Sequence, residues 1–347
     1  MVKSESFTRE HIEGIRSSYS VDALILERSI FALALLEALA KVGMPFIFKG
    51  GTSLLLLLEK PRRLSTDIDI IVEPGTDVQS YLEQVGEIYP FHSMEQQIRT
   101  GNNKIDKAHY KFTYDSPIKG AQFHILLDIL FEKSHYCTLV KRRVDHPFLS
   151  TEEPYVEVTM PSVNCILGDK LTAFAPYTTG IPFGVDKELE IIKQLYDISA
   201  LVDVHDDFDD VCDSYFATVK AELAYRGKSN SPEEVLQDTI DAAACIASRG
   251  AYHSDDYPKY LQGLRGITNH IYGERFNTEK AILPACKAMY MAACILKGER
   301  FIKIPDPSSF KGANIGNTRY AKLSLLRKLN AEAFAYAVQA IELLQME

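Results

Sequence analysis

The sequence has no hydrophobic run long enough to cross a membrane. Its most apolar short segment spans residues 54–58, whereas a transmembrane helix needs about 20 apolar residues. The first 20 residues mix acidic and basic side chains and lack the apolar core of a secretory signal. We therefore expect a cytoplasmic protein with no membrane partner.

The sequence also lacks paired cysteines. Its six cysteines are scattered along 347 residues, and none stands in a CxxC pair. Isolated cysteines in a chain of this length are typical of reduced thiols. Neither a disulfide scaffold nor a cysteine-bound zinc ion is expected.

An excess of positive charge is missing too. The chain carries 38 Lys and Arg against 47 Asp and Glu, a net charge of −9. This balance excludes a nucleic-acid-binding protein whose surface is basic overall, but it does not exclude a local basic groove. With 46% hydrophobic and 24% charged residues, the composition is that of a globular protein, and the length suggests about two domains.

Two kinds of hydrophobic patterning divide the chain. A helical repeat at 21–42 is followed by short segments typical of strands, at 45–48, 67–72, 107–114, 122–131 and 155–159. After Pro161 the pattern predicts helices at 163–173, 187–202, 208–225, 232–248, 257–272, 278–297 and 320–346. We therefore predict an α/β (α+β) fold, with an N-terminal helix and α/β domain over residues 1–160 and a helical domain over 161–347.

Two acids lie on the second of these strands. Positions i and i+2 of a strand project from one face, about 6.5 to 7 Å apart, so Asp67 and Asp69 are spaced to hold one or two divalent ions. Alternating acids also occur on ordinary solvent-facing strands, and that interpretation stays open.

A glycine pair precedes these acids. Residues 49–54 read Lys-Gly-Gly-Thr-Ser-Leu, between a short strand and an expected helix that starts near Thr52 or Ser53. Gly50 and Gly51 let the backbone approach a phosphate, and the first N–H groups and hydroxyls of the helix can hold an anion. The spacing is not that of a P-loop. The alternative is a tight turn with a Ser/Thr helix cap.

A third acid, Asp128, interrupts the apolar run of residues 125–130. An unpaired carboxylate buried there would cost several kcal/mol unless a cation or a hydrogen-bond donor meets it. A metal ion shared with Asp67 and Asp69 would satisfy it. A salt bridge, or a position at the solvent-facing end of the strand, is the alternative.

These pieces in this order resemble the nucleotidyltransferase superfamily of DNA polymerase beta, whose signature is a Gly-Gly/Ser turn, an Asp-x-Asp strand and a third carboxylate on a later strand. Residues 50–54 and 63–69 (Arg-Leu-Ser-Thr-Asp-Ile-Asp) are similar to the AbiEii/AbiGii toxin family, with its GGT-like turn and R-x-S-x-D-[IL]-D pattern. The resemblance implies a polymerase beta-like domain with a small mixed sheet.

Two later segments extend the resemblance over roughly residues 46–202. Residues 169–173 are similar to the family's E-K-x-x-A helix, and residues 193–198 to its R-D-L-Y-D-L segment. Asp169 replaces the usual Glu, and Gln194 stands where an acid is common. Only Lys170 and Asp197 are therefore carried over as site residues, and an ordinary interhelical salt bridge is their alternative.

The resemblance implies transfer of a nucleoside monophosphate from an NTP to an acceptor hydroxyl. Asp67, Asp69 and Asp128 would hold Mg²⁺, with Mn²⁺ as a substitute, and Asp128 would orient or deprotonate the acceptor. Lys170 would offset negative charge in the transition state, while Asp197 would orient Lys170 or contact base or ribose.

Further nucleotide-binding residues are expected on the turn and the loop after it. The resemblance implies that Arg63 lies near the site entrance and binds a phosphate. The alternative is that Arg63 belongs to a solvated cluster of basic residues in the loop. Ser65 is expected to cap the turn before the strand. The expected nucleotide-binding set is Gly50, Gly51, Thr52, Ser53, Arg63 and Ser65.

Two charged stretches complete the signals. The segment 297–328 contains eight basic residues and only two acidic ones. It is therefore the candidate RNA-binding surface, and a solvated helix face is the alternative. The aspartates at 203–213 are most simply favourable charge at a helix N-terminus, with a cation or basic-partner site as the minority interpretation.

The leading hypothesis is a Mg²⁺-dependent nucleotidyltransferase toxin of a bacterial toxin–antitoxin system, acting on RNA such as the tRNA 3′ end, with an antitoxin as a further partner. Alternatives are transfer to a protein or to a small molecule such as an aminoglycoside, and a non-catalytic nucleotide-binding module. A glycosyltransferase with an Asp-x-Asp site is disfavoured because it gives Asp128 and the glycine turn no role.

Overall fold

The computed structural model describes residues 1–97 and 106–346 and forms two compact units. The first comprises Met1–Ser162 and Asn269–Glu274, and the second Val163–Thr268 and Arg275–Glu347. The division after Ser162 lies two residues beyond the boundary expected from the sequence. The return of residues 269–274 to the first unit was not expected.

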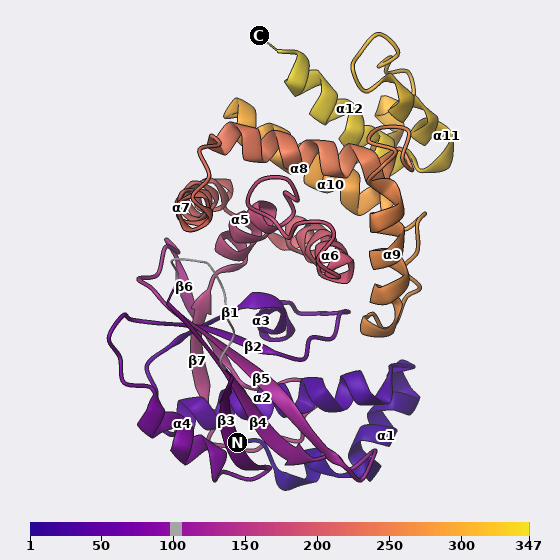
Figure 1. Cartoon of the computed structure of the whole chain (residues 1–347). Helices are drawn as coiled ribbons and strands as arrows, with labels where there is room; N and C mark the ends of the chain where they lie inside the picture. Colours follow the sequence, from indigo (N-terminus) through magenta and orange to yellow (C-terminus); the bar gives the residue numbers. More distant parts are fainter. Residues whose placement is uncertain (98–105, 347) are drawn as a thin grey trace. The chain divides into compact units, whose positions relative to one another are not determined.

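A five-stranded sheet forms the centre of the first unit (Figure 1). β2 and β5 run parallel, and the other neighbouring strands run antiparallel, so the sheet is mixed. A separate ribbon pairs β6 with β7. The sheet order is β1 (Ile47–Lys49), β2 (Ile68–Val72), β5 (Gln122–Phe131), β4 (Lys107–Asp115) and β3 (Phe91–Gln97); the ribbon consists of β6 (Leu139–Arg143) and β7 (Glu157–Pro161).

The two faces of this sheet differ in polarity. On β4, every second residue from Ala108 to Tyr114 is buried, whereas the residues between them, such as His109, are only half-buried. Helix α2 (Ala23–Lys41) covers the buried face, where the rings of Phe31 and Tyr114 stack with centroids 3.9 Å apart. Polar side chains are therefore collected on the opposite face.

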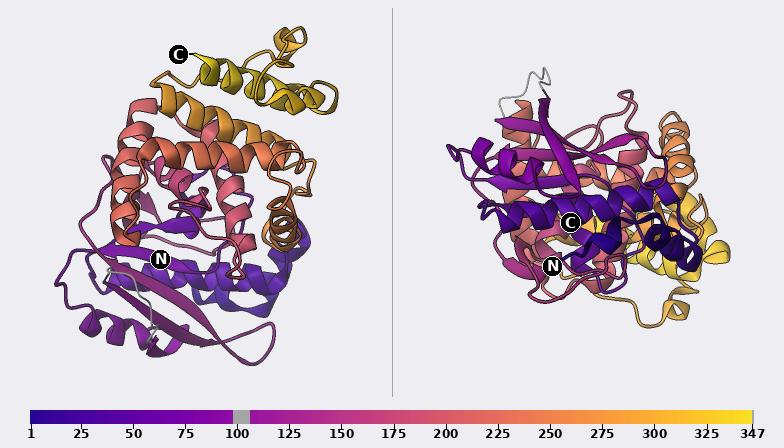
Figure 2. Two further views of the ribbon diagram at one scale, coloured as in Figure 1. Left: turned by 45° about the horizontal axis from the view of Figure 1, so that its top comes forward. Right: turned by 90° about the horizontal axis from the view of Figure 1, so that it is seen from below.

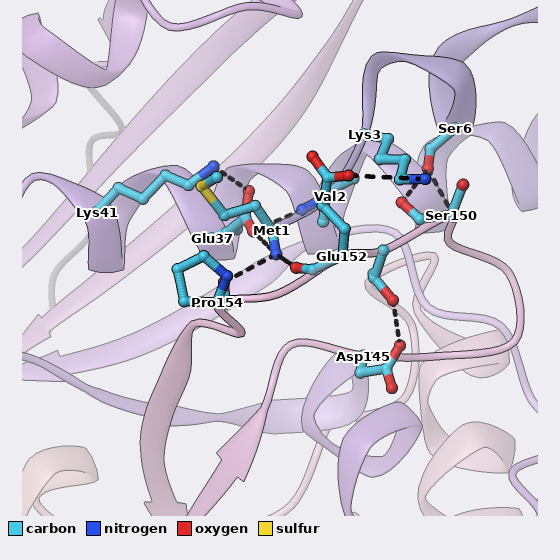
Figure 3. A network of polar contacts seen from close by, with 11 residues as sticks. Met1, Val2, Lys3, Ser6, Glu37, Lys41, Asp145, Ser150, Glu152 and Pro154 are labelled. Atoms are coloured by element: carbon cyan, nitrogen blue, oxygen red, sulfur yellow. Dashed lines mark hydrogen bonds and ion pairs between the residues drawn. The ribbon is translucent and has the colours of Figure 1, made fainter.

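Shorter helices complete the first unit, and its N-terminal segment is bonded to α2. Glu37 on α2 is buried and accepts hydrogen bonds from the Val2 backbone N–H at 2.7 Å and the Lys41 ammonium at 2.6 Å. Figure 3 shows these contacts and the neighbouring ion pair between the Lys3 ammonium and the Glu152 carboxylate, 3.7 Å apart. The remaining helices are α1 (Arg9–Tyr19), α3 (Gly50–Leu57) and α4 (Gln79–Gly86).

The second unit is helical. Helices α8 and α10 lie side by side in Figure 1 and Figure 2, and both carry runs of buried alanine that let their backbones approach. Ser231 and Glu234 form a capping box at the start of α8. The helices are α5 (Val163–Ala173), α6 (Glu188–Val204), α7 (Phe208–Arg226), α8 (Pro232–Ala247), α9 (Tyr257–Ile267), α10 (Ile282–Lys297), α11 (Leu326–Leu329) and α12 (Ala331–Gln345).

One segment of this unit that was predicted as a single helix is interrupted. The segment expected as a single helix at 320–346 is broken at Asn330, whose side chain instead caps α12 by accepting a bond from the Ala333 N–H at 2.9 Å. Asparagine competes for backbone hydrogen bonds in this way, which favours caps over helix interiors. Across the described residues, no helix combines the length and the apolarity needed to cross a membrane.

Candidate active site

A row of polar residues crosses four strands on the face of the sheet opposite α2. Asp69 on β2 and Asp128 on β5 are register partners. Lys49 on β1 is the partner of Asp69, and His109 on β4 is the partner of Asp128. Because register partners on neighbouring strands project from the same face, with strands about 5 Å apart, the two carboxylates are neighbours. We call Lys49, Asp69, Asp128 and His109 the polar row.

Asp67 lies at the entrance to β2 rather than on it. The strand begins at Ile68, one residue later than the sequence predicted. Ile68 is fully buried, while Asp67 and Asp69 on either side are half-buried, which is the alternation expected along an extended backbone. The Arg28 guanidinium lies 3.5 Å from the Asp67 carboxylate and compensates part of its charge.

The acid within the apolar run of β5 has a defined partner. Asp128 Oδ1 lies 2.6 Å from Nδ1 of His109. This contact gives Asp128 a side-chain partner, as the alternative for this residue expected; it is an ion pair only when the imidazole is protonated, and it involves Oδ1 alone. His109 was not among the site residues expected from the sequence. The available signal was its position on the polar side of an alternating strand, but the sequence did not indicate which residue it would oppose.

The turn before α3 lies directly against Asp69. Gly50 has a φ of +79°, and a Cβ there would lie 2.1 Å from Asp69 Oδ2 and 2.8 Å from its Cγ. Both the backbone conformation and the close approach therefore require glycine. Helix α3 begins at Gly50, so its N-terminal turn lies beside the Asp69 carboxylate.

The second glycine is packed against the loop that leads into β2. A Cβ on Gly51 would lie 2.5 Å from Arg63 Nη2 and 3.1 Å from Ser65 Oγ. Arg63 is only 6% exposed and its Nη1 donates to the Leu64 carbonyl. The solvated-loop alternative therefore does not describe Arg63. A β-bridge to Ile271 holds the backbone of Arg63, so the 269–274 segment supports this loop.

The hydroxyls of Thr52 and Ser53 are used inside the turn. Both residues are fully buried. Thr52 donates to the Asp67 carbonyl, and Ser53 donates to the Gly50 carbonyl at 2.7 Å. These bonds fix the turn against the start of β2. The backbone N–H groups of the first turn have no acceptor within the helix and are the groups of α3 that could donate to an anion.

Lys170 and Asp197 form a buried ion pair within the second unit. Nζ of Lys170 on α5 lies 2.8 Å from Oδ2 of Asp197 on α6, and the two side chains are 7% and 2% exposed. Gln194, which replaces the acid common in the family pattern, accepts a second bond from Lys170 at 3.0 Å. The interhelical salt bridge that was the alternative for these two residues is therefore present.

The other charged stretches are also engaged within the second unit. Six of the eight basic side chains between residues 297 and 328 bond to groups of that unit; Arg300, for example, pairs with Asp209 at 2.8 Å. In the acidic stretch, Asp207 caps α7 by accepting bonds from two backbone N–H groups. The acidic stretch thus has the helix-terminal role that its sequence indicates.

Positive charge lies near the acids of the first unit. The pKa of His124 on β5 is lowered, first by burial and then by the charges of Lys111 and Arg28, while Asp67 acts in the opposite direction. His124 therefore stays neutral near pH 7. Arg28 and Lys111 thus add positive charge to this part of the sheet, besides Lys49 of the polar row.

Carboxylates on neighbouring strands, beside a glycine turn at a helix N-terminus, form an arrangement typical of enzymes that transfer phosphate-containing groups. The model of the family described as nucleotidyl transferase AbiEii toxin, type IV TA system, matches residues 34–277. Because this match covers more than half of the chain, the chain belongs to the AbiEii nucleotidyltransferase toxin family and is a nucleotidyltransferase. The predicted family, the enzyme class and the mixed α/β fold are confirmed.

Other comparisons gave more distant likenesses. No curated protein matches the sequence. Among solved structures, JHP933 from Helicobacter pylori is 14% identical, with a TM-score of 0.43 over 78% of this chain and 93% of that one. A Helicobacter pylori protein described provisionally as a nucleotidyltransferase is 15% identical, with a TM-score of 0.47 over 79% of this chain and 99% of that one.

Proposed function

We propose that the protein transfers a nucleoside monophosphate from an NTP to a hydroxyl of RNA, with the tRNA 3′ end as the leading acceptor, and that it acts as the toxin of a toxin–antitoxin system. The observation that carries the chemistry is the pairing of Asp69 with Asp128, with the Gly50 backbone against Asp69. The toxin role and an antitoxin partner follow from the family.

The donor set fits a hard divalent cation. Asp69 and Asp128 present carboxylate oxygens on neighbouring strands, and Asp67 adds a third carboxylate one residue before β2. Mg²⁺ prefers oxygen ligands, is bound through one or two carboxylates and substrate phosphates, and can be replaced by Mn²⁺. When bound, the ion would neutralise charge on the triphosphate. These three acids would hold it.

The turn at the start of α3 would bind the phosphates. Gly50 and Gly51 bring the backbone close to Asp69 and Arg63 without a side chain between them. The first N–H groups of α3 would donate to phosphate oxygens, and the Arg63 guanidinium would add positive charge. Thr52 and Ser53 would contribute through their backbone, because their hydroxyls already donate to the Asp67 and Gly50 carbonyls.

Asp128 would serve the acceptor. Its carboxylate would accept the proton of the attacking hydroxyl as the new bond between oxygen and the α-phosphorus forms. The bond from that phosphorus to the bridging oxygen breaks, and pyrophosphate leaves with the electron pair. The role of Lys170 in offsetting charge, with Asp197 holding it, stays a prediction.

The acceptor is tested by label transfer. The protein would be incubated with each of the four α-labelled NTPs and with separate pools of RNA and protein. We expect label in the RNA pool and a loss of transfer on the order of 10²–10³-fold in Asp69→Asn. Asp115→Asn, an exposed acid at the end of β4, is the matched control and should keep full activity.

Each other outcome has a defined meaning. Label in the protein pool alone would replace RNA by a protein acceptor. Full activity in Asp69→Asn would reject the site. NTP binding without turnover in any pool would favour a binding module over an enzyme.

A further inference from the structure

The contact between His109 and Asp128 is isolated and specific. Within the described residues of the first unit, each is the hydrogen-bond partner of the other's side chain and has no second one. The ring of His109 is 17% exposed and the carboxylate of Asp128 36%. The contact is therefore a partly shielded one between two residues held in register by the backbone of β4 and β5.

A bond at this position restricts what the carboxylate can do. The terminal torsion of an aspartate is broad and roughly two-fold, so an unbonded Asp128 could present either oxygen. With its proton on Nδ1, His109 donates to Oδ1 at 2.6 Å, a short contact with a charged acceptor. That bond selects Oδ2 as the oxygen left for other ligands.

The backbone that carries the ring is held in place. Strand β4 lies between β5 and β3, and His109 is in register with Asp128 on one side and Gln97 on the other. The backbone on both sides of His109 is therefore fixed by strand pairing. A donor anchored in this way loses little conformational entropy when a ligand binds.

We infer that His109 is a positioning residue, which orients Asp128 so that a single oxygen serves the divalent ion and the acceptor hydroxyl. The inference rests on the proposed function, because it assigns His109 a role only if Asp128 has one. A positioning donor next to a metal-binding group commonly contributes 10–100-fold in metal affinity.

The test separates the bond from the bulk of the ring. His109→Asn keeps an N–H at the place of Nδ1, His109→Gln moves the amide toward the place of Nε2, and His109→Phe keeps the ring without a donor. His124→Phe replaces another histidine on the same face of the sheet and is the matched control. Mn²⁺ binding to the metal-free full-length protein would be measured by electron paramagnetic resonance, with thermal unfolding as the check on folding.

For His109→Phe and His109→Gln we expect a dissociation constant for Mn²⁺ that is 10–100-fold larger than that of wild type. For His109→Asn and His124→Phe we expect a dissociation constant within about threefold of wild type. Equal affinity in all variants would overturn the inference, as would a loss in His109→Asn equal to that in His109→Phe. If Asp128→Ala binds Mn²⁺ as wild type does, the proposed metal site fails and this inference with it. If Asp128→Ala loses binding and His109→Phe does not, only the role of His109 fails.

Discussion

Gly50→Ala tests the close approach between the glycine turn and Asp69. An alanine Cβ would lie 2.1 Å from Asp69 Oδ2, whereas ordinary contact begins at 3.4 Å, so the carboxylate must move by more than about 1 Å. A displacement of about 1 Å at a reacting group costs on the order of 100-fold in rate, or about 2.7 kcal/mol of transition-state stabilisation. The positive φ of +79° adds about 1–2 kcal/mol of lost folding stability.

Gly75→Ala separates these two costs. Gly75 has a similar φ of +84°, and its Cβ would meet nothing within 4 Å. Both variants should therefore lose about 1–2 kcal/mol in urea unfolding, because both place alanine in the left-handed region. Only Gly50→Ala should lose about 100-fold in kcat/KM for nucleotidyl transfer. Equal activity in the two variants would refute the claim that the turn must lie against Asp69.

Two further predictions concern buried charge. Lys170→Met should lower the free energy of urea unfolding by about 3–5 kcal/mol, because it leaves Asp197 buried without its cation. The double variant Lys170→Met/Asp197→Leu should recover most of this loss. If the ion pair is only structural, the double variant keeps transfer activity; if Lys170 is catalytic, the double variant loses that activity. Burial lowers the pKa of His146 to about 4. As the pH falls, His146 binds a proton near pH 6.5 in the unfolded chain but only near pH 4 in the native chain. The contribution of neutral His146 to the unfolding free energy is therefore full above pH 6.5, and about 3 kcal/mol of it is lost as the pH falls to 4. His146→Asn, which keeps an acceptor for the Phe148 N–H, should reduce the difference in unfolding free energy between pH 7 and pH 4 by that amount; an unchanged difference would contradict the assignment.

The strands that could be predicted from sequence are those with one buried face. β4 alternates between buried and half-buried residues, and its sequence shows the same alternation, whereas β5 could be predicted from its apolar run. Strands β3 and β6 were missed because most of their side chains are exposed, so pairing at the edge of a sheet left no hydrophobic pattern in the sequence.

The acids of the candidate site could be named from motifs, but their arrangement could not. That Asp69 opposes Asp128, and Asp128 opposes His109, depends on strand register, which is set by pairing between distant segments. The support of Arg63 by Ile271 is likewise a contact across more than 200 residues. Neither is encoded in a local pattern.

The most direct test of the central claim compares two labelled forms of one NTP. If the polar row and the glycine turn catalyse nucleotidyl transfer, label from the α-phosphate enters the acceptor, label from the γ-phosphate leaves as pyrophosphate, and both events disappear in Asp69→Asn while its unfolding free energy stays close to wild type. Label from the γ-phosphate in the acceptor, or undiminished α-label transfer by Asp69→Asn, would contradict the account.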